Sequence, residues 1–197
     1  MKSLRLLLCA LPLALTGCST MSAVNWSAAY PWNWFGSSME VTEQGVGKLT
    51  ATTPLNEQAI SDALGGSYRL RSGMKAANGN IVRYFEALKD DKVAMTINGD
   101  GGTINRIEVR DSEIKTERGV QVGTPFSELY SKAFGHCQKG ASDNGTVVEC
   151  KADGSQHISY AFTGHWNGPE ELMPSDDTLK NWKICKIIKW KTDIRSN

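Results

Sequence analysis

Short runs in which apolar and polar residues alternate, separated by turn-forming pairs, constrain the fold of this chain more than any other feature. In 92–98 and 157–162 every second residue is a large apolar one, which is typical of strands with one buried face. Asn-Gly pairs at 78–79, 98–99 and 144–145 favour tight hairpin turns. The sequence therefore predicts a mainly β fold of antiparallel, sandwich-like sheets, with an α+β fold as the alternative.

Two kinds of local signal place the elements within this pattern. Segments 80–88, 91–98 and 103–110 are short and close together, so we expect them to form an antiparallel meander. Segments 53–64 and 124–134 each open with Thr-Pro, carry an acid in the first turn and are followed by Gly. These signals predict two short helices with Thr as N-cap and Pro at the first helical position.

The size and charge of the chain limit the number of domains and the class of partner. The chain has 197 residues, 40% of them hydrophobic, which suits the core of one ordinary domain. We expect that domain to span 40–197. A formal net charge of +1 argues against binding to nucleic acid, because contacts to phosphates need a basic excess.

The N-terminus predicts export and lipid attachment. Lys2 and Arg5 precede an apolar run of signal-peptide length at 6–15, too short to span a bilayer. The residues up to Cys18 resemble the lipobox of bacterial lipoproteins, which implies that 1–17 is removed and that the Cys18 thiol carries a diacylglyceryl group. Ser19 follows, and the family sorting rule implies the outer membrane, with the domain facing the periplasm.

An aromatic tether at 18–39 joins the predicted anchor to the domain. Trp26, Trp32 and Trp34 stand close together in it. Indole rings are favoured at a lipid interface, so one interpretation places them against the membrane. The other is that they fold back and cover an apolar patch of the domain.

Export also determines the expected chemistry of the cysteines. Only Cys137, Cys150 and Cys185 would remain in the oxidising periplasm as thiols available for pairing. Cys137 and Cys150 flank a turn-rich loop that brings its ends together, so we predict a disulfide between them. Cys185 lies in an apolar run, which favours a buried thiol.

The same region also raises the alternative of a zinc site. Its potential ligands are His136, Cys137, Cys150, His157 and His165. In an exported chain a closable Cys pair favours the disulfide over the metal. We therefore predict no metal site and no cofactor.

A lysine-rich segment near the C-terminus suggests a contact surface. Lys183, Lys186 and Lys189 interleave with Ile and Trp side chains. Such a strand suits anionic lipid headgroups or other envelope polyanions. The alternative is an exposed edge strand whose lysines block pairing with another chain.

Several of these motifs together carry a resemblance to a known family. Beside the lipobox and Cys137 with Cys150, they are Gly45-Val46-Gly47 before Thr53-Pro54-Leu55-Asn56-Glu57, and Ile107-Glu108-Val109 before Gly119-Val120-Gln121-Val122-Gly123. Over its full length the chain resembles the enterobacterial RpoE-regulated outer-membrane lipoproteins of the YfeY type. The resemblance implies a mainly β, sandwich-like periplasmic domain, expression under envelope stress and no assigned activity, and it provides no catalytic or binding residues.

We therefore expect a non-catalytic, outer-membrane-anchored binding or maintenance factor with an unidentified envelope partner. The alternative is a hydrolase that acts on cell wall or lipid through the loop 163–177, where His165, Glu170 and Glu171 gather. That chemistry needs two groups placed across a cleft, which adjacency in sequence does not provide.

Overall fold

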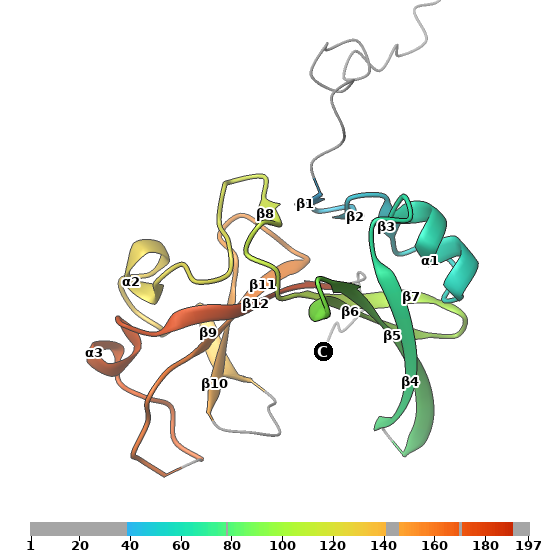
Figure 1. The fold of residues 1–197 in the computed structure, drawn as a ribbon. Coiled ribbons are helices and arrows are strands. Elements are labelled where there is room, and N and C mark those ends of the chain that lie inside the picture. The colour runs from blue at the N-terminus through green and yellow to red at the C-terminus, as the bar shows by residue number, and fades with distance from the viewer. Residues whose placement is uncertain (1–38, 78, 141–145, 170, 191–197) are drawn as a thin grey trace, which may run out of the picture. The chain divides into compact units, whose positions relative to one another are not determined.

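An eight-stranded antiparallel sheet forms the centre of the computed structural model, which describes residues 39–77, 79–140, 146–169 and 171–190 (Figure 1). In spatial order its strands are β4 (Arg69–Ala77), β5 (Asn80–Lys89), β6 (Lys92–Asp100), β7 (Thr103–Val109), β12 (Lys183–Trp190), β11 (Ile158–Thr163), β10 (Val147–Lys151) and β9 (Cys137–Gly140). The predicted meander is confirmed as β5, β6 and β7, and β4 extends it. The mainly β prediction is also confirmed.

A second, four-stranded sheet is built from very short strands. Its order is β3 (Leu49–Thr50), β2 (Gly45–Val46), β1 (Glu40–Val41) and β8 (Lys115–Thr116). All its pairs are antiparallel except β1 with β8, which is parallel. Val41, Val46 and Leu49 are fully buried and belong to the main hydrophobic core, so this sheet covers part of the large one.

The two faces of the large sheet differ in composition because alternate residues of a strand point to opposite sides. We call one side the core face; it carries Phe85, Ile97, Ile107, Phe162 and Ile187, each at most 2% exposed. We call the other side the polar face; it carries Glu86, Thr96, Glu108, Ser159 and Lys186. The strand pairing keeps each set together, since Phe85 lies opposite Ile97 while Glu86 lies opposite Thr96.

The first predicted helix is present but begins later than expected. Helix α1 spans Glu57–Ala63, and its N-cap is Asn56, whose side-chain oxygen accepts a hydrogen bond from the Ala59 backbone N–H at 2.9 Å. The prediction of Thr53 as N-cap was wrong because Pro54 forms an isolated β-bridge with Thr103. The backbone at 53–54 is therefore held extended before the helix begins.

The second predicted helix is much shorter than 124–134. Helix α2 spans only Phe126–Leu129, and Tyr130 is already in the extended conformation. Thr124 does not cap it, because the Thr124 hydroxyl accepts a hydrogen bond from the Gln121 backbone N–H instead. Tyr130 leaves the helix because its ring packs into the core beside Phe126, with ring centroids 5.3 Å apart.

A third helix was not predicted. Helix α3 spans Asp176–Leu179, and the Ser175 hydroxyl caps it by accepting a hydrogen bond from the Thr178 backbone N–H. Asp176 also accepts a hydrogen bond from the Ala133 backbone N–H at 2.8 Å, which ties α3 to the segment after α2. Within the described part of the chain, no helix is long and apolar enough to cross a membrane.

Candidate functional site

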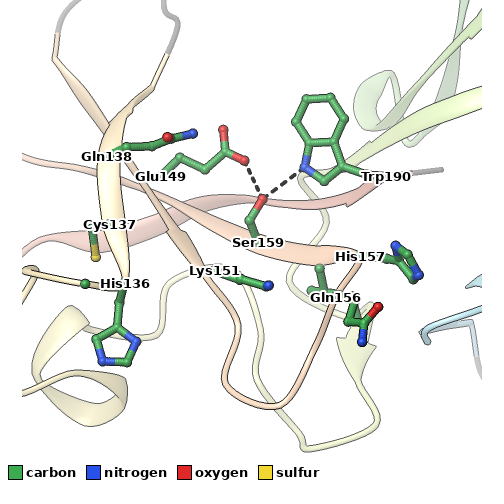
Figure 2. Close-up of a pocket in the computed structure, with 11 residues that line it drawn as sticks. His136, Cys137, Gln138, Glu149, Lys151, Gln156, His157, Ser159 and Trp190 are labelled. Carbon is green, nitrogen blue, oxygen red and sulfur yellow. Dashed lines mark hydrogen bonds between the residues drawn. The ribbon is translucent and has the colours of Figure 1, made fainter. Parts of the chain in front are cut away.

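An open cavity of about 470 Å³ lies where β9, β10, β11 and the end of β12 meet (Figure 2). The side chains that give it its chemistry are His136, Gln138, Glu149, Lys151, Gln156, His157, Ser159 and Trp190. Most of these groups are polar. The cavity is therefore the first candidate for a binding site.

Strand register explains why these side chains gather on one side. Gln138 of β9 lies opposite Glu149 of β10, and Lys151 of β10 lies opposite Ser159 of β11. Residues paired in this way project to the same face of a sheet. All four therefore belong to the polar face.

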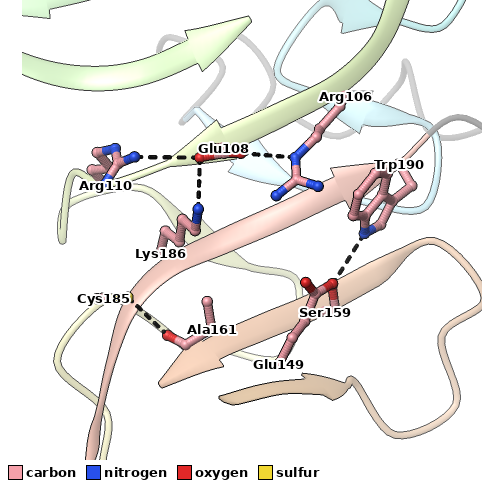
Figure 3. Close-up of polar contacts among 9 residues, drawn as sticks. All are labelled: Arg106, Glu108, Arg110, Glu149, Ser159, Ala161, Cys185, Lys186 and Trp190. Atoms are coloured by element: carbon pink, nitrogen blue, oxygen red, sulfur yellow. Dashed lines mark hydrogen bonds and ion pairs between the residues drawn. The ribbon is translucent and has the colours of Figure 1, made fainter. Parts of the chain in front are cut away.

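A line of hydrogen bonds fixes the wall of the cavity (Figures 2 and 3). The Ser159 hydroxyl donates to the Glu149 carboxylate and accepts a hydrogen bond from the Trp190 indole N–H at 3.2 Å. Ser159 is only 7% exposed. The carboxylate and the indole are thus held in position from both sides of a buried hydroxyl.

The indole also connects the cavity to a cluster of ions on the polar face (Figure 3). The Arg106 guanidinium lies over the Trp190 ring, 3.9 Å from its centroid, which is a close cation–π contact. Arg106 Nε donates to Glu108 Oε1 at 2.7 Å. Lys186 Nζ donates to Glu108 Oε2 at 2.9 Å, and Arg110 Nη2 reaches the same oxygen at 3.3 Å.

Glu108 is the anionic centre of this cluster. Burial alone would raise the pKa of its carboxyl, but the neighbouring charges of Arg106, Lys186 and Arg110 outweigh burial and hold that pKa below its ordinary value. Glu108 is therefore ionised at neutral pH. This one carboxylate offsets one of the three positive charges around it and is shared by all three side chains.

The predicted lysine surface requires a correction. Strand β12 lies between β7 and β11, so the expectation of an edge strand was wrong. Lys186 is bound to Glu108, and Lys189 is 6% exposed, with its ammonium group donating to the Trp190 carbonyl at 2.5 Å. Burial lowers the pKa of Lys189. Of the three, only Lys183 is exposed and able to meet a membrane or partner as predicted.

The disulfide prediction agrees with the structure. Cys137 of β9 lies directly opposite Cys150 of β10, and their sulfur atoms are 2.07 Å apart. Cys185 is half-buried and its thiol donates to the Ala161 carbonyl at 3.3 Å. Burial raises the pKa of this thiol, which makes it a weak nucleophile.

The other predicted site residues are dispersed. His136 and His157 line the cavity, whereas His165 is exposed in the loop after β11. Among the residues that the structure describes, no group of three or more His, Cys, Asp and Glu side chains is placed to hold a metal ion. Cys18, Trp26, Trp32 and Trp34 lie outside the described residues.

In the loop 163–177 the side chain that bonds to the loop backbone is Trp166, not His165, which the sequence singled out. The Trp166 indole N–H donates to the Pro169 carbonyl at 3.1 Å. Glu170 lies outside the described residues. In the part of this loop that the structure describes, neither a hydrogen bond nor an ion pair joins His165 to a carboxylate.

Sequence reasoning did not find Trp190, Ser159, Glu149 or Arg106. A signal was present for two of them, because Ser159 stands in a regularly alternating segment and Trp190 ends the lysine-rich apolar run at 183–190. Strand register brings Ser159 and Trp190 together, although they are 31 residues apart in the chain. That register follows from the tertiary fold.

Comparison with known proteins agrees with the fold. The chain is 73% identical over 191 residues to the uncharacterized protein YfeY of Escherichia coli strain K12, a match covering 97% of this chain and all of the relative. The crystal structure of the E. coli protein matches with a TM-score of 0.71 at 68% identity, covering 77% of this chain and 99% of the solved one. The resemblance to YfeY-type proteins is thereby confirmed. A family model described as a protein of unknown function (DUF1131) matches residues 23–192, so the chain belongs to the DUF1131 family.

Proposed function

We propose that this protein is a non-catalytic binding or maintenance factor of the bacterial envelope, anchored through lipid on Cys18 to the periplasmic side of the outer membrane. The cavity at the β9–β12 end of the large sheet is its binding site. The family is one of unknown function, so the proposal depends on the chemistry of the chain itself.

The observation that carries the binding part is the Glu149–Ser159–Trp190 line. It supplies a carboxylate and an indole in fixed positions on the wall of an open cavity of about 470 Å³. Pre-positioned polar groups beside an aromatic ring are typical of ligand sites. The open form of the cavity suits recognition of part of a larger envelope component.

The anchoring part is supported by the sequence. Two cations, an apolar run of signal-peptide length and Cys18 follow one another in the order that lipoproteins use. Two acyl chains give stable membrane attachment, whereas a single chain gives only marginal binding. A domain held in this way remains close to envelope components, which favours a binding role even at modest affinity.

Palmitate labelling tests the anchor. Cells producing the full chain or its Cys18→Ala variant are supplied with labelled palmitate and then fractionated. We expect label in the wild-type chain only, found with the outer membrane, and accumulation of precursor when globomycin blocks the signal peptidase. Equal labelling of both chains, or of neither, would contradict the proposal.

Site-specific photo-crosslinking in intact cells tests the binding site. A benzoylphenylalanine placed at Gln156, on the cavity, is compared with one at Gln44, an exposed glutamine that does not line this cavity. We expect adducts with one class of envelope component from position 156 and none from position 44. Identical adducts from both positions would mean that the cavity has no special role.

A further inference from the structure

We propose that the cavity beside Trp190 binds a saccharide chain. This inference rests on the proposed binding function and names the ligand class of that same site. A saccharide presents many hydroxyl groups around its rings and apolar C–H faces above and below them. The cavity offers a counterpart to each.

The charge of the lining favours an uncharged ligand. Glu149 contributes one carboxylate and Lys151 one ammonium group, so their formal charges cancel. A phosphate-rich ligand would have to approach the Glu149 carboxylate, and a polycation would meet Lys151. An uncharged polyhydroxylated ligand meets no like charge at either residue, so it avoids both repulsions.

The hydrogen-bonding groups match hydroxyl groups in kind. Gln138 and Gln156 are exposed on the cavity, and each amide offers N–H donors together with a carbonyl acceptor. A sugar hydroxyl donates and accepts at once, so it pairs with either end of an amide. The Glu149 carboxylate adds a strong acceptor whose position the Ser159 hydroxyl fixes.

Two aromatic side chains supply surfaces for sugar rings. Trp190 lines the cavity, although the Arg106 guanidinium covers one face of its ring. Phe134 is 93% exposed and directly precedes Gly135, another lining residue. The C–H bonds of a sugar ring carry partial positive charge and pack on the negative face of an aromatic ring. Such a ligand would explain why the phenylalanine next to a cavity-lining residue is left exposed to solvent.

Two other partners fit the cavity less well. A lipid surface would need a mainly apolar lining, whereas this cavity also carries the amides of Gln138 and Gln156 and the charges of Glu149 and Lys151. An extended peptide would pair with the free edge of β9, but that strand has only four residues. The saccharide is the class that uses the amides, the carboxylate and the rings together.

Calorimetric titration of the purified full-length protein tests the inference, in a detergent without a sugar headgroup. The probes are tetra-N-acetylchitotetraose and cellotetraose. We expect saturable binding of at least one probe with a Kd on the order of 1 mM or tighter. Phe134→Ala and Gln156→Ala should each weaken it about ten-fold, because each removes one kind of contact without disturbing the core.

Matched controls use residues of the same type and exposure elsewhere. Ile81→Ala removes a large apolar side chain that is 76% exposed on the β4–β5 hairpin, and Gln44→Ala removes an exposed amide. Both controls should bind the probe as the wild type does. Equal affinity in all five proteins would overturn the inference, because binding would not involve the cavity.

Failure of the saccharide inference is distinguishable from failure of the proposed function. No saturable heat with either probe up to about 10 mM overturns the saccharide assignment. If Phe134→Ala then reduces cosedimentation with phosphatidylethanolamine–phosphatidylglycerol vesicles, the exposed ring contacts membrane instead. Palmitate labelling and the crosslinks from position 156 report on the proposed function independently of either result.

Discussion

The two faces of the eight-stranded sheet are built from the same strands but are held together by different forces. On the core face, Phe162 and its neighbours exclude water completely and pack ring against ring. On the polar face, Glu108 and its three cations are joined by directional contacts that are partly exposed to solvent. The comparison suggests that the core face supplies most of the stability, while the polar face supplies a fixed surface that a ligand can use.

The largest expected effect comes from opening the core face. Phe162→Ala should lower the free energy of unfolding by about 3–5 kcal/mol, because it removes a fully buried ring and leaves a cavity beside Phe126 and Tyr130. Urea denaturation followed by tryptophan fluorescence measures it. Phe134→Ala is the matched control, since the same atoms are removed from a 93% exposed position. A similar loss in both variants would mean that burial does not distinguish these sites.

The disulfide, which lies on the core face, gives the next largest expected effect. Cys137 and Cys150 pair across β9 and β10 with 13 residues of separation, and Cys150 is fully buried in the main core. The double variant Cys137→Ser with Cys150→Ser should lose about 3 kcal/mol, by the chain-entropy model for a loop of this length.

Cys185→Ser provides the control for that experiment because its hydroxyl can still donate to the Ala161 carbonyl. We expect this variant to unfold close to the wild type, and the wild-type Cys185 thiol to react slowly with maleimide in the native state, since burial raises its pKa. Rapid labelling of native protein would contradict the placement of Cys185.

The ion cluster on the polar face should matter less, and its effect should depend on pH. Glu108→Gln leaves Arg106, Lys186 and Arg110 without their shared anion, and we expect a loss of about 2–3 kcal/mol at pH 7. The folded-state pKa of Glu108 lies below its ordinary value of 4.5. Its contribution is therefore complete above that pH and is lost as pH falls through the folded pKa.

Denaturation at several pH values tests this sign. The stability gap between wild type and Glu108→Gln should be constant above about pH 5 and should narrow towards pH 3. Glu113→Gln is the control, because the Lys89–Glu113 pair is exposed and should contribute nothing measurable. A gap that widened on acidification would show that the carboxylate is not stabilised by the cations.

The core face is the part of the fold that the sequence predicted well. Alternation at 92–98 was readable because the core face is apolar and the polar face is not. The helices were predicted less well, since capping signals are local. A tertiary contact overrode them twice: Pro54 bridges to Thr103, and Tyr130 turns away from α2 into the core.

The polar face was harder to predict because its partners are distant in the chain. Lys186 looked like a free cation, but its partner Glu108 stands 78 residues earlier. Strand β12 was mistaken for an edge because only the order β7–β12–β11 reveals its central place. The candidate site depends on the same register, since Trp190 and Ser159 meet across two strands.

The smallest expected effect is an increase in the free energy of unfolding, whereas the variants above, apart from their controls, decrease it. It gives the sharpest test of how the two faces differ. Asn98 projects to the polar face opposite Arg106, yet it is 6% exposed, and its amide N and O atoms have no hydrogen-bond partner among the described residues. A buried amide without partners costs free energy, whereas an apolar group of similar size does not. Asn98→Val should therefore raise the free energy of unfolding by about 1 kcal/mol, helped by the strand preference of valine. Asn98→Asp is the control and should destabilise, because it buries a charge opposite Arg106, whose guanidinium is already paired with Glu108. If Asn98→Val instead unfolds more easily than the wild type, the amide contributes to stability, and the polar face depends on polar contacts even at its buried positions.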